Sequence, residues 1–217
     1  MPRVIPTAYY NNPFIGLYAR ASDRLTIMAG NCHAKLVDAA REALGTPVEK
    51  TFISESHLVG IYTAMNSNGV ILPSTSKEEK LFKKHGLNVY KLDTYAPGNT
   101  IVCNDKACLT STHIPSAAAK KIGDALGVEV FTQRFSGLGS AATTSALTNK
   151  GILAYNELTE TELKHLAKMF GVYASVGTTN FGVPFNSLGI VANSNGALVG
   201  RDTTGYEMQR IYETLFG

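Results

Sequence analysis

The sequence predicts a mixed α/β fold in which five strand-hairpin-helix units form a ring with five-fold pseudosymmetry. Three observations predict it. Segments with the pattern of a helix stop at glycines that recur at nearly constant spacing, Gly45, Gly86, Gly127, Gly171 and Gly217. A turn between two apolar runs precedes each helix. The helices carry apolar residues on one face, so each unit must bury that face against its neighbours.

The glycine stops divide the 217 residues without a remainder. We expect one domain made of five repeats, at about residues 1–45, 46–86, 87–127, 128–171 and 172–217. An open stack of such units needs a polar unit to cover each end, and the sequence has no atypical unit of that kind. This favours a closed ring, with an open solenoid as the alternative.

The first unit contains predicted strands at residues 15–19 and 25–28, joined by a turn at residues 21–24. Its helix is predicted at about residues 34–44.

The second unit is the clearest copy. Residues 51–53 and 59–65 are predicted strands, and a turn at residues 66–69 leads into a third strand at residues 70–72. The Asn-Gly step in this turn favours the left-handed backbone of a tight hairpin. A helix is predicted from Thr75 to His85.

The third and fourth units vary this pattern. In the third, the turn at residues 104–106 is followed by Ala107 where other units have glycine, so this copy is the weakest match. The fourth unit has predicted strands and a turn at residues 128–131, 142–147, 148–151 and 152–154. Its helix runs from Thr159 to Gly171, and Thr159 and Glu162 have the spacing of a capping box.

The fifth unit repeats the order once more, with predicted strands and a turn at residues 172–176, 186–192, 193–196 and 197–199. A helix then runs to Gly217 with its apolar residues on one face, Met208, Ile211, Tyr212 and Leu215.

Composition limits the class of protein. An apolar fraction of 44% is enough for a globular core, and no run approaches the 18 apolar residues of a membrane span. The start of the chain also lacks the pattern of an export signal, so we expect a cytoplasmic protein without a membrane partner. A net charge of +3 fits a partner that contains nucleic acid, although proteins that bind mainly through phosphates are far more basic.

The cysteines do not predict a metal site or a disulfide. Three of them are too few for a disulfide framework, as expected in a reducing compartment. Cys103, Cys108 and His113 are spaced too widely for a compact zinc site, even with Cys32 and His33 as further ligands. Cys103 and Cys108 flank the third hairpin turn, where packing between facing strands accounts for both.

No cofactor is predicted either. Gly137 and Gly139 resemble part of a glycine-rich loop, but the sequence lacks the Gly-Lys-Ser/Thr step of a phosphate loop.

Several segments together resemble the family of translation initiation factor six. In chain order they are residues 11–19, 60–73, 97–105, 128–131, 177–180, 188–193 and 200–204. The resemblance extends from about residue 9 to the last helix. Because the chain ends directly after this helix at Gly217, it is similar to the archaeal form of the family.

The resemblance implies the pentein fold, a five-fold α/β ring, and a role in translation initiation and ribosome biogenesis. It implies a monomer that binds the intersubunit face of the large ribosomal subunit and keeps the small subunit from joining. The contact is expected chiefly with the L14-type ribosomal protein beside the sarcin-ricin loop of the large rRNA. Because the block is steric, no catalytic group, metal or cofactor is implied.

The resemblance also places binding residues in the loops that precede each hairpin. They are Asn12, Leu58, Asn99 and Phe185, with Asn186 as a neighbour and Ser145 as the corresponding residue of the fourth unit. Equivalent positions lie on one face of a closed ring, and apolar anchors among amide groups are typical of a protein interface. Each asparagine also fits a turn former, and Leu58 and Phe185 also fit core positions.

A pentein-fold enzyme that modifies guanidine groups is the alternative function. Such enzymes use a cysteine nucleophile late in the chain, with a histidine and carboxylates around the ring axis. Here no cysteine follows Cys108, and the last histidine, His165, lies on a predicted helix. The sequence therefore favours a factor that is not an enzyme.

Overall fold

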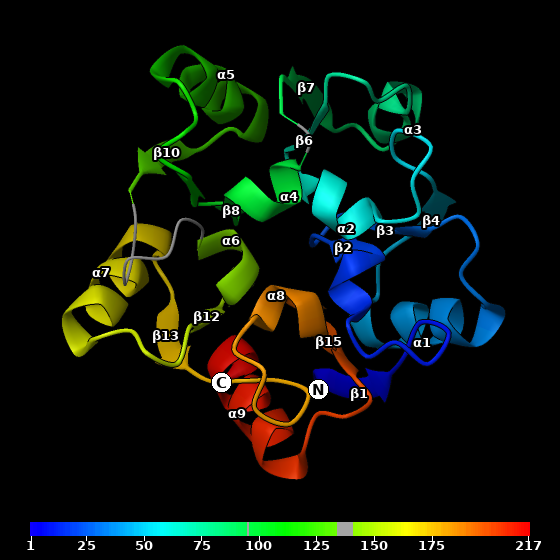
Figure 1. The fold of residues 1–217 in the computed structure, drawn as a ribbon, viewed down its shortest axis with the longest axis vertical. Coiled ribbons are helices and arrows are strands. Elements are labelled where there is room, and N and C mark those ends of the chain that lie inside the picture. The colour runs from blue at the N-terminus through cyan, green and yellow to red at the C-terminus, as the bar shows by residue number, and fades with distance from the viewer. Residues whose placement is uncertain (95, 134–140) are drawn as a thin grey trace.

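A computed structural model describes residues 1–94, 96–133 and 141–217. These residues form five three-stranded sheets around a central axis, with the longer helices on the outside (Figure 1). The predicted ring of five repeats is therefore confirmed. Gly137 and Gly139 lie outside the described residues.

Each of the first four sheets combines a hairpin with a strand that follows the next helix. In the first sheet, β2 (Ala19–Ala21) and β3 (Thr26–Ala29) are antiparallel, and α1 (Ala34–Leu44) leads to β4 (Val48–Thr51), which is parallel to β3. The next three sheets repeat this order. The second has β5 (Ala64–Met65), β6 (Gly69–Pro73), α3 (Glu79–Lys84) and β7 (Asn88–Leu92), and the third has β8 (Ile101–Cys103), β9 (Ala107–Thr110), α5 (Ser116–Leu126) and β10 (Glu129–Thr132). The fourth has β11 (Ala146–Leu147), β12 (Gly151–Ala154), α7 (Glu160–Phe170) and β13 (Tyr173–Val176).

The fifth sheet joins the two ends of the chain. Its hairpin is β14 (Ile190–Asn193) and β15 (Gly196–Gly200), followed by the last helix, α9 (Gly205–Phe216). Its third strand is β1 (Arg3–Thr7), which runs parallel to β15 from the pair Arg3–Gly196 to the pair Thr7–Gly200. Because the first strand completes the last sheet, the ring is closed, and the alternative of an open solenoid is wrong.

A short helix precedes each hairpin, and this differs from the prediction. The described residues contain η1 (Ile15–Leu17), α2 (Val59–Tyr62), α4 (Pro97–Thr100), α6 (Ala141–Thr144) and α8 (Asn186–Gly189). Strands predicted at residues 15–19, 59–65, 142–147 and 186–192 are therefore helical in their first part and extended only at their ends. The reason is that an apolar run a few residues long has the same pattern in a buried strand and in a buried helical turn.

These short helices surround the axis (Figure 1), and each packs against the next. Glycine makes the close approach possible at two junctions that are easily compared. A Cβ atom on Gly60 would overlap the carbonyl of Gly16, and one on Gly98 would overlap the carbonyl of Gly60. Backbone therefore touches backbone around this end of the ring, which leaves little freedom for the helices to move separately.

The turn at residues 66–69 also differs from the prediction, because neither Asn68 nor Gly69 has a positive φ. The Asn66 side chain accepts hydrogen bonds from the N–H groups of Asn68 and Gly69, both at 3.0 Å, and this holds the turn without left-handed residues. Glycine is needed at position 69 for space, since a Cβ atom there would overlap the carbonyl of Ala125.

The hairpin turns are linked to one another by the same side chains. Asn66 Nδ2 donates to the carbonyls of Asn104, at 3.0 Å, and Leu126, at 2.9 Å. Asn104 and Asn193 bridge in the same way to the next turn and to the end of a helix. The asparagine that opens each of these three turns therefore forms contacts between units as well as within the turn.

The ends of the long helices follow the prediction closely. Gly45, Gly86, Gly127 and Gly171 have φ between 61° and 71°, the left-handed conformation that ends a helix. The capping box of Thr159 and Glu162 is present. α3 is shorter than the predicted helix from Thr75 to His85, because the Glu78 carboxylate accepts a hydrogen bond from the N–H of Lys77 at 2.9 Å and fixes the preceding residues in a turn.

Strand bounds shift by a few residues. The strand predicted at residues 51–53 is β4, which ends at Thr51, and the remaining predicted strands overlap β3, β6, β10, β12, β13 and β15.

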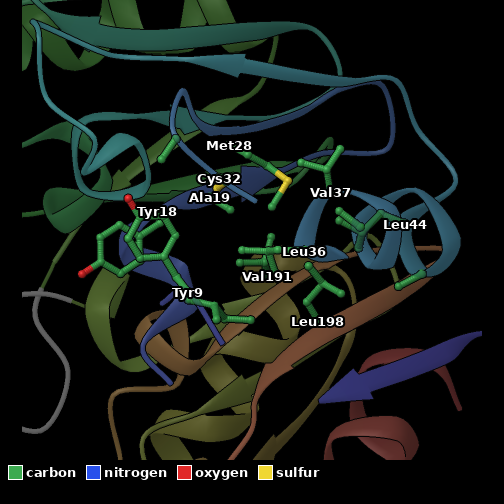
Figure 2. Close-up of a cluster of buried hydrophobic side chains, with 14 residues drawn as sticks. Tyr9, Tyr18, Ala19, Met28, Cys32, Leu36, Val37, Leu44, Val191 and Leu198 are labelled. Atoms are coloured by element: carbon green, nitrogen blue, oxygen red, sulfur yellow. The ribbon is translucent and has the colours of Figure 1, made fainter. Parts of the chain in front are cut away.

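The core is divided into five clusters, and the contacts that form them cross from one unit to the next. In the first cluster, Leu36 and Leu44 of α1 lie against Val191 of β14 and Leu198 of β15 (Figure 2). Each unit therefore obtains part of its core from its neighbour, which is the expected arrangement for a repeat that cannot bury its apolar face alone. No helix in the described part of the chain is long and apolar enough to cross a bilayer.

Candidate functional site

Left-handed turns project ahead of the short helices in the first, second and fifth units, with two residues of positive φ in the first two and three in the fifth, where Gly182 is the third. Within the described residues, positive φ angles outside glycine occur at Tyr10, Asn11, Ser54, Glu55, Asn180 and Phe181. Each turn is closed by backbone hydrogen bonds, for example 2.9 Å and 2.8 Å between Tyr9 and Asn12. The fifth, first and second units are consecutive around the ring, so the three turns lie on adjacent units (Figure 1).

An aromatic stack supports the first two turns. The rings of Tyr9 and Tyr18 lie parallel with centroids 3.7 Å apart, and His57 stacks on Tyr18 with its centroid at 5.7 Å. Tyr9 also donates from its hydroxyl to Asn31 Oδ1 at 2.8 Å. Burial raises the pKa of Tyr9. His57 directly follows the turn of the second unit, which closes between Ile53 and Ser56, so the stack ties this turn to the first.

Glu207 anchors the third turn. Its carboxylate accepts hydrogen bonds from the backbone N–H groups of Gly182 at 2.9 Å and Phe181 at 3.2 Å, and from the Thr178 hydroxyl at 2.8 Å. It also forms a capping box with Thr204 at the start of α9. Burial raises the pKa of Glu207, but these hydrogen bonds outweigh it and hold the pKa below the usual value for glutamate.

The tips of these turns expose large apolar side chains. Phe181 is 81% exposed and Tyr10 is 60% exposed, although both stand on backbone that is fixed by hydrogen bonds. Phe185, directly before α8, is 43% exposed. Rigid, exposed aromatic side chains lose little conformational entropy on binding and are therefore effective anchors for a protein partner.

The predicted binding residues all lie at the short-helix end of the ring. Asn12 closes the first turn, where its Nδ2 donates to the Tyr18 hydroxyl at 3.0 Å and its Oδ1 accepts from Phe14 N–H at 2.9 Å. Leu58 precedes α2, is half-buried and packs against the first core cluster. Asn99 lies on α4 and is half-buried.

Ser145 and Asn186 differ from the other predicted residues because both are buried, at 3% and 0% exposure. Asn186 Nδ2 donates to three carbonyls, those of Thr144, Ala154 and Gly177, at 2.9 to 3.1 Å. Its side chain therefore connects three segments of the fourth and fifth units. The exposed side chain at this point of the surface is that of its neighbour, Phe185.

Sequence reasoning missed Tyr10, His57, Phe181 and Glu207. A signal existed for Glu207, because Thr204 and Glu207 have the spacing of a capping box. The left-handed turns had no comparable signal, since Tyr10, Glu55 and Phe181 are residues that seldom adopt a positive φ.

Cys32 packs in the same core cluster as Tyr9 and Tyr18, whereas Cys103 and Cys108 lie on the third sheet. Cys103 and Cys108 face each other across the pairing of β8 and β9, as their packing in facing strands predicts. Burial raises the pKa of Cys103 to about 12 and that of Cys32 to about 11, so both thiols are protonated at neutral pH and are not activated nucleophiles. The described residues contain no cluster of three or more His, Cys, Asp or Glu side chains suited to a metal ion.

Comparison with known proteins places this architecture in a family. The model of the eIF-6 family matches residues 4–214. Translation initiation factor 6 of Pyrococcus abyssi is 35% identical over an alignment that covers 95% of this chain and 96% of that protein. The corresponding factor of Pyrobaculum aerophilum is 36% identical with 98% of each chain covered, and that of Staphylothermus marinus is 31% identical with 99% of this chain and 98% of that protein covered. Since the match extends from β1 to α9 and the relatives align over nearly their full length, the chain belongs to the eIF-6 family.

Proposed function

We propose that this protein binds the large ribosomal subunit on its intersubunit face and prevents the small subunit from joining. The observation that carries the proposal is the family match over residues 4–214, with relatives named translation initiation factor 6. The factor would act as a single chain in the cytoplasm, in initiation or in maturation of the subunit. The contact is assigned, from the resemblance, to the L14-type ribosomal protein beside the sarcin-ricin loop.

The short-helix end of the ring is the surface proposed to meet the subunit. Phe181, Phe185 and Tyr10 are exposed apolar side chains of this surface, and Asn12, Leu58 and Asn99 lie on it with partial exposure. Ser145 and Asn186 would act indirectly, since both side chains are buried and Asn186 holds the backbone next to Phe185 through its hydrogen bonds. Apolar anchors surrounded by amide groups suit a protein partner better than a phosphate backbone.

The proposed block is steric and requires no chemical step. A rigid ring bound to the intersubunit face occupies the volume that the small subunit needs. The backbone contacts between short helices and the hydrogen bonds that fix each turn favour such a role, because a preorganised surface loses little entropy on binding. The raised pKa of Cys103 gives no support to the alternative of a guanidine-modifying enzyme.

The function is tested on a sucrose gradient with purified archaeal large and small subunits. The protein should migrate with the large subunit and reduce the amount of joined ribosomes in proportion to the bound fraction. A protein that stays at the top of the gradient, or that binds without reducing joined ribosomes, would contradict the proposal.

The binding surface is tested with Phe181→Ala combined with Phe185→Ala. Removing both side chains should weaken large-subunit binding by about 10- to 100-fold, the range for loss of interface anchors. Tyr173→Ala is the matched control, because Tyr173 on β13 is an aromatic residue that is 59% exposed. It pairs with Gly151 beside a hairpin turn, at the end of the ring opposite the short helices, which we call the hairpin-turn end. Asn99→Ala with Phe185→Ala tests the residues predicted from the resemblance, and cooperative unfolding of each variant separates lost binding from lost folding.

A further inference from the structure

A partly open cavity lies on the axis of the ring. It has a volume of about 50 Å³, and its wall comes from the hairpin strands of all five units, including Ala19, Ala64, Val102, Ala146 and Val191. This is several times the space that one buried water molecule requires. The cavity lies between the short helices at one end and the hairpin turns at the other.

Arg20 of β2 is the charged side chain among the described residues that line this cavity. Its Nη2 donates to the carbonyls of Gly60, at 2.6 Å, and Gly98, at 3.4 Å. Its Nε is buried and has no hydrogen-bond partner. Burial lowers the pKa of Arg20, but a guanidinium does not release its proton in a protein, so the positive charge remains on the axis.

The wall around Arg20 contains no carboxylate among the described residues. The acidic residues on the axis, Asp23 and Asp105, line the neighbouring hollow at the hairpin-turn end. Both carboxylates accept hydrogen bonds from serine residues there. Asp23 accepts hydrogen bonds from the N–H and hydroxyl of Ser194 at 2.7 and 2.6 Å, and Asp105 accepts from the N–H and hydroxyl of Ser67, both at 2.7 Å.

Asn149 closes this end of the axis between the two acids. Its Nδ2 donates to Asp23 Oδ2 at 2.8 Å and to Asp105 Oδ2 at 2.7 Å. The carboxylates are therefore held in the turns of the ring by fixed donors. They do not form an ion pair with Arg20. Within the described part of the chain, this half-buried cation therefore has two backbone carbonyls as hydrogen-bond acceptors and the Cys103 thiol near it, and no carboxylate.

We propose that the axial cavity binds a small monovalent inorganic anion of the halide class next to Arg20. A buried charge without a counter-ion is costly, and an anion that accepts from a guanidinium N–H recovers much of that cost. One positive charge matches one negative charge, so a monovalent ion is favoured over a divalent one. The alanine, valine and isoleucine side chains of the wall suit a weakly hydrated ion, and the anion would join β2 to the facing strands.

The first test measures thermal unfolding in sodium bromide and in sodium gluconate at equal ionic strength. Bromide should raise the Tm of the wild-type protein in proportion to the logarithm of its concentration above Kd, by about 4 °C at a concentration tenfold above Kd. The rise should disappear in Arg20→Gln. Arg24→Gln is the matched control, because Arg24 lies on the same hairpin, is exposed and should keep the rise. An equal rise in wild type and Arg20→Gln would overturn the proposal.

The second test needs no variant and decides the question if Arg20→Gln fails to fold. Crystals of the wild-type protein are grown or soaked in sodium bromide, and anomalous scattering locates the ion. A peak within hydrogen-bond distance of the Arg20 guanidinium supports the site. Water molecules alone in the cavity, with bromide found only on the outer surface, would show that the guanidinium is hydrated and that the proposal is wrong.

Discussion

Glu207→Gln offers a sharp test of how the turn that carries Phe181 is held. The substitution keeps the shape of the side chain but replaces one carboxylate oxygen with an amide group. Oε1 accepts from the Gly182 N–H and Oε2 accepts from the Phe181 N–H. In either orientation, the amide of glutamine therefore places its NH2 group against one of these backbone N–H donors.

The magnitude follows from these contacts. One hydrogen bond from a backbone N–H to a charged acceptor is lost, which costs about 1.5 to 3 kcal/mol, and the bonds that remain become neutral and weaker. Glu207 is only 6% exposed, so solvent replaces little of this loss. Together we expect the free energy of unfolding to fall by about 2 to 3 kcal/mol, which corresponds to a fall in Tm of roughly 5 to 10 °C for a chain of this size.

The assay is urea denaturation followed by circular dichroism, with Glu213→Gln as the control. Glu213 lies on the same helix, is exposed, and accepts a hydrogen bond from Gln209 at 2.9 Å, so its variant should change stability by less than about 0.5 kcal/mol. Amide hydrogen exchange at residues 181 and 182 should accelerate in Glu207→Gln alone. Equal stability of the two variants, with unchanged exchange at the turn, would refute the role given to Glu207.

Three further predictions concern pH, the inner ring and the thiols. The folded-state pKa of Glu49 is lowered chiefly by its hydrogen bond with His85, and that of Glu207 is also below its unfolded value of 4.5. Both carboxylates therefore stabilise the fold above pH 4.5, and this contribution is lost as the pH falls through the lower folded pKa values. Urea denaturation should give a lower stability at pH 3.5 than at pH 6, and the difference should be smaller in Glu207→Gln. Gly60→Ala should destabilise by about 1 to 3 kcal/mol because its Cβ overlaps backbone, whereas Gly205→Ala, where nothing lies within 4 Å, should stabilise by about 0.4 to 1 kcal/mol, as calorimetry would measure. Iodoacetamide at pH 7.5 should label the cysteines only in urea, because burial raises the pKa of all three thiols in the native protein. Mass spectrometry measures the labelling, and rapid modification of Cys103 in the native protein would contradict this prediction.

The repeat could be predicted from sequence because its signals are local. A glycine in the left-handed conformation ends a helix wherever it stands, and the capping box at Thr159 depends on residues three positions apart. Closure could be inferred only indirectly. The pairing of β1 with β15 joins residues from opposite ends of the chain, and no local pattern encodes it.

The candidate site was harder to predict because neighbouring residues have opposite environments. Phe185 is exposed while Asn186 is fully buried, and only the position of three carbonyls from other segments explains why an amide is buried there. The short helices escaped prediction because their residues are apolar and lie directly before a strand. The predicted set therefore mixes buried residues that support the surface, such as Asn186, with exposed residues that form it, such as Phe185.

The pairing of β1 with β15 sets an order for folding during synthesis. The first four sheets use segments that follow one another, so each can form soon after its last strand leaves the ribosome. β1 is made first, yet its partner is made almost last, so it must wait with an unpaired edge until nearly the whole chain is present. An incomplete chain therefore cannot close into a ring, and the short-helix end becomes a single rigid surface only when synthesis is nearly finished.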